Sequence, residues 1–171
     1  GDARLEPGSL DALVEHIDAI DGPRVVAPRV CNRDGSDQGT ARSFPTPAAF
    51  VFGRRSPLSR LFPNNRLTRR YLVGRDKTGV EAYEVDWVSG ACLMIDRESL
   101  QQLDGLDERF FMYWEDADIC KRVKSAGGSV WCVPSIRVIH DEGSSASVVS
   151  RRQNARFHRS AYHYAAKHML V

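Results

Sequence analysis

Four apolar residues near the start of the chain recur at helical spacing: Leu10, Leu13, Val14 and Ile17. This spacing predicts a helix with one apolar face, whose first turn Ser9 can cap. The apolar run at residues 24–28 has no such period and predicts a short buried strand. Residues from the turn cluster at 32–36 to about Arg55 lack a sustained period, which indicates loop or short helix.

The second half of the chain alternates strand-like and helical patterns. Residues 85–95 predict a strand that Ser89 and Gly90 interrupt, and a glycine inside a strand often marks a bulge or the close approach of a ligand. Residues 97–103 predict a short helix, which Asp96 can cap.

The remaining elements continue this alternation. Residues 116–126 predict a helix that ends at a pair of glycines. Residues 129–133 and 136–140 predict two strands separated by Pro134, and a last, basic helix is expected to start near Val149. Helices that alternate with strands rich in Val, Ile and Trp indicate an α/β sandwich, although the predicted strands are few.

The composition agrees with a globular α/β protein. A chain of 171 residues fits one domain and can bury a useful core. Hydrophobic residues make up 42% and charged residues 27%, which is typical of soluble domains. No apolar run approaches the roughly 20 residues that a transmembrane helix needs. The four cysteines do not have the paired spacing of a zinc site, and we expect them to be reduced and structural. They are Cys31, Cys92, Cys120 and Cys132.

The net charge of +2 is too small to predict a dedicated nucleic-acid-binding protein. Its distribution is more informative, because seven arginines interleave with large apolar residues between positions 54 and 75. The arginines are Arg54, Arg55, Arg60, Arg66, Arg69, Arg70 and Arg75. This composition favours peripheral contact with an anionic membrane or with phosphates. The alternative is a solvated basic face whose arginine stems cover apolar neighbours.

The most informative stretch is residues 110–122, where five bulky apolar or aromatic residues precede three carboxylates. Such neighbours risk desolvating Glu115 and Asp116, which disfavours their ionised form unless a cation, a metal or hydrogen-bond donors compensate. Either residue is therefore a candidate general base. The alternative is that both occupy the first turn of a helix, where the helix dipole favours negative charge. We expect Asp118 to cap the helix or face solvent, and to pair with Arg122 at i, i+4.

Four motifs follow one another in the chain: Asp-Trp-Val-Ser-Gly-Ala at 86–91, Gly-Leu-Asp-Glu-Arg-Phe-Phe at 105–111, Trp-Glu-Asp at 114–116 and Val-Ile-His at 138–140. In this order and at this spacing they resemble a family 2 glycosyltransferase, most closely its rhamnosyltransferase-like bacterial branch. The resemblance is strong over residues 84–145 and weaker at both ends of the chain. It implies a GT-A fold, that is, an α/β sandwich that binds a nucleotide-diphospho-sugar.

The resemblance also implies how the chain is organised. The N-terminal half of such a domain holds the nucleotide, and this chain begins where that half would end. We therefore expect a C-terminal portion that lacks the nucleotide-binding half. Residues 1–148 would form the acceptor-side part of the domain, and residues 149–171 a basic, helical C-terminal extension.

Sugar transfer with inversion needs a base that deprotonates an acceptor hydroxyl, and a group that stabilises the leaving diphosphate. By resemblance Asp116 is the base, and Glu115 positions it or the acceptor. Also by resemblance, His140 and Asp2 are metal ligands that would hold Mg²⁺ or Mn²⁺, although Gly1 departs from the family's pattern before Asp2. From the residues alone, a single histidine at a strand end is more often an ordinary surface residue.

Small residues and two tryptophans are the candidates for substrate binding. Ser89, Gly90 and Ala91 would let donor and acceptor sugars approach the strand closely. Trp87 or Trp114 would offer a flat surface on which a pyranose ring can stack. The alternative for each tryptophan is a place in the core, which is the favoured interpretation for Trp87 inside its apolar strand.

Two functions of different classes fit the sequence. By resemblance, the first is an inverting glycosyltransferase that moves a sugar, with rhamnose as a candidate, from a nucleotide-sugar donor. Its acceptor would be a cell-surface polysaccharide or a polyprenyl-diphosphate-linked glycan, and its location cytoplasmic, peripheral on the inner face of the cell membrane. The second is a non-catalytic module that binds glycans or lipid head groups. The lack of a Gly-rich phosphate loop, and of a complete metal-binding Asp-x-Asp motif at Asp2, favours it for an isolated fragment. Metal-assisted hydrolysis by Asp116 and His140 has no second ligand set to support it.

Overall fold

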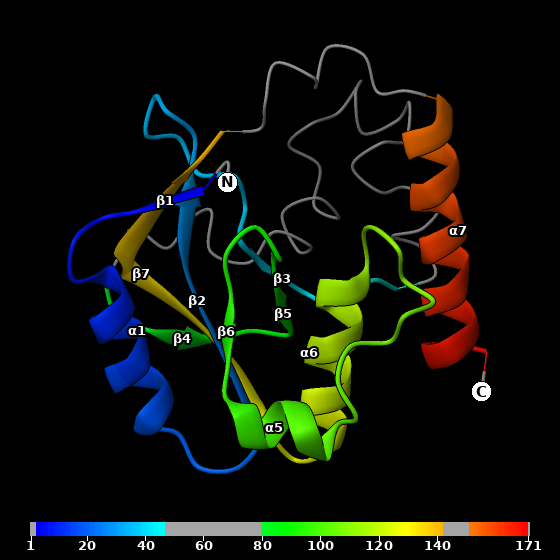
Figure 1. Cartoon of the computed structure of the whole chain (residues 1–171), viewed down its shortest axis with the longest axis horizontal. Coiled ribbons are helices and arrows are strands. Elements are labelled where there is room, and N and C mark those ends of the chain that lie inside the picture. Colours follow the sequence, from blue (N-terminus) through cyan, green and yellow to red (C-terminus); the bar gives the residue numbers. More distant parts are fainter. Residues whose placement is uncertain (1–2, 47–79, 142–150, 171) are drawn as a thin grey trace.

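The computed structural model (Figure 1) describes residues 3–46, 80–141 and 151–170 of the chain. Their central feature is a five-stranded sheet in which β2 (Arg24–Cys31) runs parallel to β7 (Ser129–His140). Three short strands pair antiparallel with these two: β1 (Ala3–Leu5) and β4 (Tyr83–Glu84) with β7, and β6 (Met94–Ile95) with β2. The α/β architecture that the sequence predicts is confirmed.

Helices pack on both faces of the sheet, and alternate residues of the two central strands supply the two cores. Val25 faces the core under α6 (Glu115–Ser125), whereas Val26, the next residue, faces α1 (Ser9–Asp18). In β7, Val130 likewise faces the core under α6 and Val133 faces α1. A strand buried on both faces needs apolar residues at successive positions, which explains the continuously apolar runs in the sequence.

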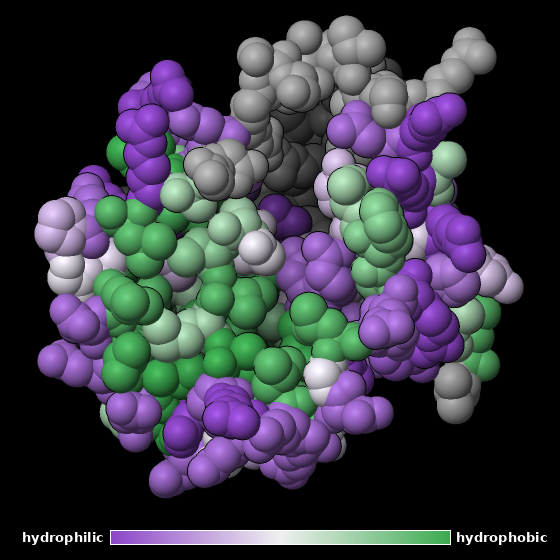
Figure 2. All heavy atoms as spheres, in the orientation of Figure 1, coloured by the Kyte–Doolittle hydropathy of each residue, from purple (hydrophilic) through white to green (hydrophobic). Residues whose placement is uncertain are grey.

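Helix α1 differs from the predicted helix in its cap and in its buried face. Gly8 precedes the helix in the left-handed conformation at φ 81°, and no side chain caps the helix, so the predicted Ser9 cap is wrong. The buried residues are Ser9, Leu13 and Ile17. Leu10 and Val14 are 58% and 41% exposed, because the apolar face is wider than the part of the sheet that covers it. Figure 2 shows apolar side chains gathered on this side of the molecule, over α1 and β6.

The strand predicted over residues 85–95 is wrong as one element, although its predicted interruption is present. The segment forms β5 (Trp87–Val88), a turn through Ser89 and Gly90, and then β6. The two strands belong to different sheets, because β5 lies antiparallel to β3 (Ala41–Arg42) and β6 to β2. The turn at Ser89 and Gly90 thus takes the chain from the small sheet to the large one.

The two strands predicted around Pro134 form one strand, β7. Proline has no backbone N–H to donate to a neighbouring strand. The register with β2 shifts here, since Pro28 pairs with Val133 but Arg29 pairs with Arg137. The proline therefore lies in a bulge that interrupts the pairing without ending the strand.

The three helices predicted in the second half are confirmed with small changes in their bounds. Helix α5 (Arg97–Gln102) follows Asp96, whose carboxylate accepts a hydrogen bond from the Ser99 N–H at 2.9 Å. Helix α6 ends before Gly127, whose left-handed φ of 81° closes the last turn. Helix α7 (Arg151–His168) lies beside α6 (Figure 1), and its last turn bonds to Asp118 of that helix.

Two predictions from composition can be compared with the described residues. No two of the four cysteines form a disulfide, and three of them are buried: Cys31, Cys120 and Cys132. In the part of the chain that the structure describes, no helix is long and apolar enough to cross a membrane.

Candidate active site

The turn after β5 lies against the first turn of α6. The Gly90 N–H, in the turn after β5, donates a hydrogen bond to Asp116 Oδ2 at 2.9 Å. The Ala117 N–H donates to Asp116 Oδ1 at 2.8 Å, so backbone donors hold both oxygens of the carboxylate. A Cβ added to Gly90 would lie 3.3 Å from the Asp116 Cβ, which is tighter than ordinary contact. The glycine therefore lets this carboxylate approach the backbone.

Burial raises the pKa of the Asp116 carboxyl above its ordinary value. The hydrogen bonds from Gly90 and Ala117 and the charge of Arg42 act in the opposite direction without cancelling the effect of burial. A carboxylate with a raised pKa binds a proton more tightly, which makes it a stronger general base.

Glu115, the first residue of α6, is half-buried next to Asp116. Burial, and to a smaller extent the neighbouring charge of Asp116, raises the pKa of its carboxyl. Its Oε2 atom is buried and accepts no hydrogen bond from any residue that the structure describes. A buried acceptor without a donor is costly, so this oxygen is suited to accept a hydrogen bond from a bound molecule.

Two bulky residues in the left-handed backbone conformation precede the carboxylates. Tyr113 has a φ of 68° and Trp114 a φ of 73°. This conformation costs non-glycine residues roughly 1–3 kcal/mol each, and such strain is concentrated at functional sites. The Trp114 ring contacts Phe157 and Tyr164 of α7, at centroid distances of 5.8 and 5.1 Å. Aromatic residues of the protein therefore already pack against this candidate stacking surface.

Ser89 and Ala91, the other small residues proposed for substrate binding, flank Gly90 in its turn. The Ser89 N–H donates to the Thr40 carbonyl at 3.0 Å, which ties the turn to the segment that leads into β3. The three predicted small residues and Asp116 thus lie in one place, as the motif order suggested.

His140 ends β7 and belongs to a second polar cluster. Its Nδ1 lies 2.9 Å from Gln38 Oε1, while Gln38 Nε2 donates to the His140 carbonyl and to Asn32 Oδ1, both at 2.7 Å. Because the amide nitrogen of Gln38 faces two acceptors, its oxygen faces Nδ1, which must carry the proton. This tautomer leaves the lone pair on Nε2, as a metal-ligating histidine requires.

The second predicted metal ligand, Asp2, lies outside the described residues. Ala3, the next residue in the chain, is the register partner of His140 between β1 and β7. Within residues 3–46, 80–141 and 151–170 there is no group of three or more His, Cys, Asp and Glu side chains that could hold a metal ion. The described residues therefore supply His140 as one candidate ligand but no complete set.

No family model matches the sequence, but several known proteins are similar to it. N-acetylglucosaminyl-diphospho-decaprenol L-rhamnosyltransferase of Mycobacterium tuberculosis is 32% identical over 165 residues, which cover 96% of this chain and 52% of that protein. The chain belongs to this glycosyltransferase family. Rhamnosyltransferase WbbL of Escherichia coli is 36% identical over 76 residues, or 41% of this chain and 29% of that protein. Low-salt glycan biosynthesis hexosyltransferase Agl10 of Haloferax volcanii is 25% identical over 118 residues, or 69% of this chain and 33% of that protein.

The chain spans about half the length of the Mycobacterium tuberculosis relative, although the match extends over nearly all of the chain's own residues. Its family membership agrees with the resemblance that the four sequence motifs carry. Because the match covers about half of this relative, the reaction, substrates and partners of the chain are proposals.

Trp87 is a core residue, which is the interpretation that its apolar strand favours. It is 4% exposed, and its ring N–H donates to the Ser43 carbonyl at 2.9 Å. The Arg42 guanidinium lies over the ring, 4.7 Å from its centroid, and its charge acts on Asp116. Sequence reasoning misses Arg42, because it lies in a stretch without periodicity and its neighbours are distant in the chain.

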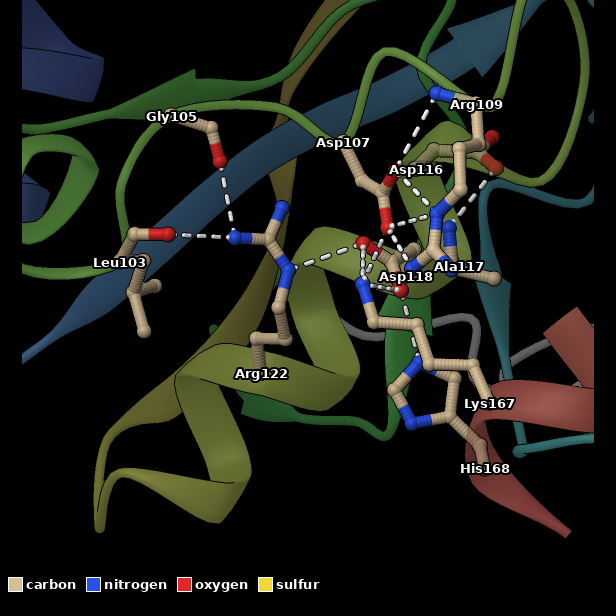
Figure 3. Close-up of polar contacts among 10 residues, drawn as sticks. All are labelled: Leu103, Gly105, Asp107, Arg109, Asp116, Ala117, Asp118, Arg122, Lys167 and His168. Carbon is tan, nitrogen blue, oxygen red and sulfur yellow. Dashed lines mark hydrogen bonds and ion pairs between the residues drawn. The ribbon is translucent and has the colours of Figure 1, made fainter.

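The expectation that Asp118 caps the helix or faces solvent is wrong, because the side chain is only 1% exposed. Figure 3 shows it among Arg122, Lys167 and His168. Its oxygens lie 2.8 Å from Arg122 Nε, 2.8 Å from Lys167 Nζ and 2.7 Å from His168 Nε2. The predicted pair with Arg122 is confirmed. Lys167 and His168 come from the last turn of α7, and no local pattern marks them as partners of a residue in α6. Compensation of its charge gives Asp118 a structural role.

Proposed function

We propose that the protein acts as an inverting glycosyltransferase of GT-A fold with Asp116 as its base. The donor would be a nucleotide sugar, with rhamnose as the sugar, and the acceptor a polyprenyl-diphosphate-linked glycan. One observation supports this most. A partly buried carboxylate with a raised pKa is held by two backbone N–H groups in a chain 32% identical to N-acetylglucosaminyl-diphospho-decaprenol L-rhamnosyltransferase.

In the proposed reaction Asp116 accepts the proton of an acceptor hydroxyl while that oxygen attacks the anomeric carbon of the donor sugar. The glycosidic bond forms as the bond from the anomeric carbon to the donor diphosphate breaks, and the diphosphate leaves with both electrons of that bond. Attack from the opposite face inverts the anomeric configuration. Because Asp116 acts as a base only when ionised, we expect turnover to rise as the pH rises through its raised pKa.

Neighbouring groups would support this reaction. Without a side chain at Gly90, the Asp116 carboxylate can lie against the backbone of the turn, beside which an acceptor hydroxyl would bind. A second acceptor hydroxyl would give the buried Glu115 Oε2 the donor that the described residues do not provide. The charge of Arg42, close enough to act on Asp116, would attract a phosphate group of the donor or acceptor.

We also propose that His140 and Asp2 hold Mg²⁺ or Mn²⁺ in the enzyme. The tautomer that Gln38 imposes on His140 fits metal ligation, and Ala3, which follows Asp2 in the chain, pairs with His140. A divalent cation bound there would neutralise charge on the leaving diphosphate.

The exposed face of α7 supports peripheral contact with an anionic membrane. The helix has no acidic residue, and Arg152, Arg156 and Arg159 are exposed at helical spacing on its largely hydrophilic surface (Figure 2). The Arg156 guanidinium lies over the ring of Phe111, which is 73% exposed. Cationic and aromatic side chains together are typical of surfaces that contact anionic lipid. The basic segment 54–75, from which the sequence predicts this contact, lies outside the described residues.

The test of the base compares Asp116→Asn with Asp11→Asn in the full-length enzyme, with release of nucleoside diphosphate as the readout. Asparagine cannot accept the proton, so we expect the turnover number of Asp116→Asn to fall by about 10²–10⁴-fold. Asp11 is exposed on α1, and Asp11→Asn should keep wild-type turnover. Substantial turnover by a folded Asp116→Asn enzyme would refute the assignment. Glycan binding by the wild-type enzyme without any turnover would favour the non-catalytic module.

A further inference from the structure

Helix α7 packs its aromatic residues against the turn that directly precedes the helix of the proposed base. Phe157 contacts both residues of the left-handed turn, with its ring centroid 5.6 Å from that of Tyr113 and 5.8 Å from that of Trp114. Tyr164, which is 1% exposed, lies 5.1 Å from the Trp114 ring. These contacts join a segment far along the chain to the two residues immediately before Glu115.

Polar contacts also fix α7, one at a residue between these two rings in the sequence and two in the last turn of the helix. Ser160 is buried, and its Oγ donates to the Met112 carbonyl at 2.8 Å. In the last turn of the helix, Lys167 Nζ and His168 Nε2 lie 2.8 and 2.7 Å from oxygens of Asp118. Asp118 follows the proposed base by two residues, so α7 is anchored in the same helical turn of α6 that carries the base.

The segment before the turn is held by the same group of residues (Figure 3). Lys167 Nζ also lies 2.7 Å from Asp107, and Arg122 donates to the carbonyls of Leu103 and Gly105 at 2.6 and 2.8 Å. Side-chain contacts therefore hold both the segment before the turn and the helix after it. The turn between them depends on α7 for its packing.

The backbone of the turn needs such external support. The left-handed conformation brings the Cβ of a bulky residue close to its own backbone, so Tyr113 and Trp114 adopt it only where surrounding contacts outweigh the strain. The same two residues set the direction from which α6 begins, and Trp114 is the residue directly before its first turn. The position of the first carboxylates of α6 thus depends on this turn.

We propose that Phe157 and Tyr164 of α7 are positioning residues of the active site, which hold the Tyr113 and Trp114 turn and thereby keep Asp116 against the Gly90 backbone. The role of Asp116 as base rests on the proposed function, whereas its placement does not. The segment 149–171, proposed above as a C-terminal extension, is then part of the catalytic apparatus.

Two backbone amides report the position of Asp116, because the N–H groups of Gly90 and Ala117 donate to different oxygens of its carboxylate. In ¹H–¹⁵N NMR spectra of this chain, both amide shifts should follow the ionisation of Asp116 as the pH changes. Among the described residues, the other titratable or charged groups that act on or beside Asp116 are Arg42 of β3 and Glu115 and Cys120 of α6. Arg42 stays charged, burial raises the pKa of Cys120 to about 12, and Glu115→Gln in every sample removes the third titration.

In Phe157→Leu we expect the Gly90 amide to lose its pH-dependent shift, because the relaxed turn moves Asp116 Oδ2 away from it. The Ala117 amide, in the same helix as Asp116, should keep its pH-dependent shift. Tyr162→Leu is the matched control, since it removes an aromatic ring from the same helix at a position that is 68% exposed. In that control both amides should titrate as in the wild type.

Ser160→Ala is the milder variant, which keeps the rings of α7 but removes the bond to the Met112 carbonyl. We expect it to weaken the Gly90 shift, so the test remains decisive if Phe157→Leu does not fold. Wild-type titration of the Gly90 amide in folded Phe157→Leu, or in Ser160→Ala where Phe157→Leu does not fold, would overturn the proposal.

Turnover separates this proposal from the proposed function. In the full-length enzyme, Phe157→Leu should lower kcat by about tenfold or more with little change in the KM for the donor, because binding groups stay in place while the base moves. If the wild-type enzyme shows no transfer, the proposed function fails, and the NMR titration still decides whether α7 positions Asp116.

Discussion

Asp116 and Asp118 stand two positions apart in the first turn of α6, yet their surroundings are opposite. Asp118 is buried with nitrogen atoms of Arg122, Lys167 and His168 against its oxygens. Among the described residues, the oxygens of Asp116 accept hydrogen bonds only from backbone N–H groups, and burial raises the pKa of its carboxyl. Cationic side chains thus compensate the charge of Asp118, whereas no such side chain bonds to Asp116 among the described residues.

This difference indicates which carboxylate is structural and which is available for chemistry. A buried carboxylate paired with cations belongs to the packing of the protein, and breaking such a pair is strongly destabilising. A carboxylate whose ionised form is disfavoured in the folded protein is suited to take up a proton. The sequence shows both as acidic residues beside an aromatic run, and only their partners separate them.

The largest expected effect concerns the stability of the two variants. Asp118→Asn leaves the charges of Arg122 and Lys167 without their carboxylate, so we expect it to lower the free energy of unfolding by about 3–5 kcal/mol. Asp116→Asn removes no direct ion pair among the described residues and should change this free energy by less than about 1 kcal/mol. Urea unfolding at pH 7 measures both. Equal losses in the two variants would remove the distinction between the two sites.

The contact between Gly90 and Asp116 is the next target. The Cβ of Gly90→Ala would press on the Asp116 side chain, and displacing a catalytic group by about 1 Å can cost about 10²-fold in rate. We therefore expect Gly90→Ala to lower the turnover number of the full-length enzyme by about that factor. Ser125→Ala, at the exposed far end of α6, is the control and should stay near wild type. A Gly90→Ala enzyme with wild-type turnover would show that the position of Asp116 does not limit the reaction.

Lys167 extends the comparison to two lysines in different surroundings. Lys167 Nζ lies 2.7 Å from Asp107 and 2.8 Å from Asp118, whereas Lys124 forms an ion pair with Glu84, whose side chain is 48% exposed. Lys167→Met should lower the free energy of unfolding by about 2 kcal/mol, because it breaks two partly buried contacts. Lys124→Met should cost less than about 1 kcal/mol, as exposed pairs do. Urea unfolding of both variants checks the order, and a larger loss in Lys124→Met would reverse it.

The smallest expected effect is the acid dependence that Asp107 contributes. Hydrogen bonds from Arg109 and Lys167 hold the pKa of this carboxyl well below its ordinary value. Its stabilisation is therefore complete above about pH 4, where the carboxyl of the unfolded chain is ionised, and is lost as the pH falls towards the lowered pKa. Wild type should exceed Asp107→Asn by about 1–2 kcal/mol at pH 7, and the gap should narrow at pH 3. A gap in urea unfolding that stays constant between pH 7 and pH 3 would contradict this.

Much of the fold follows from local patterns in the sequence. Helix α5 begins after the capping Asp96 and helix α6 ends before Gly127, and both signals act within a few residues. The division of residues 85–95 between two sheets was not predictable, because it depends on the pairing of β5 with β3, whose residues lie far away in the chain. The exposure of Leu10 and Val14 likewise depends on how much of α1 the sheet covers.

The candidate site divides in the same way. The order of the motifs identifies Asp116 and Gly90 as candidate residues of one site, and in the structure the two form a hydrogen bond. The burial of Asp118 was mispredicted, because the residues that compensate its charge belong to the last turn of α7. A neighbouring apolar run signals desolvation of a carboxylate but says nothing about which cations the fold brings to it.

A ¹³C NMR titration of the Asp116 carboxyl in this chain tests most directly whether this residue is the uncompensated carboxylate. A midpoint above the ordinary aspartate value of 3.8 is expected, because burial outweighs the backbone donors and the charge of Arg42. A midpoint at or below that value would mean that Asp116 is compensated like a structural carboxylate, and the assignment of the base would have to be given up.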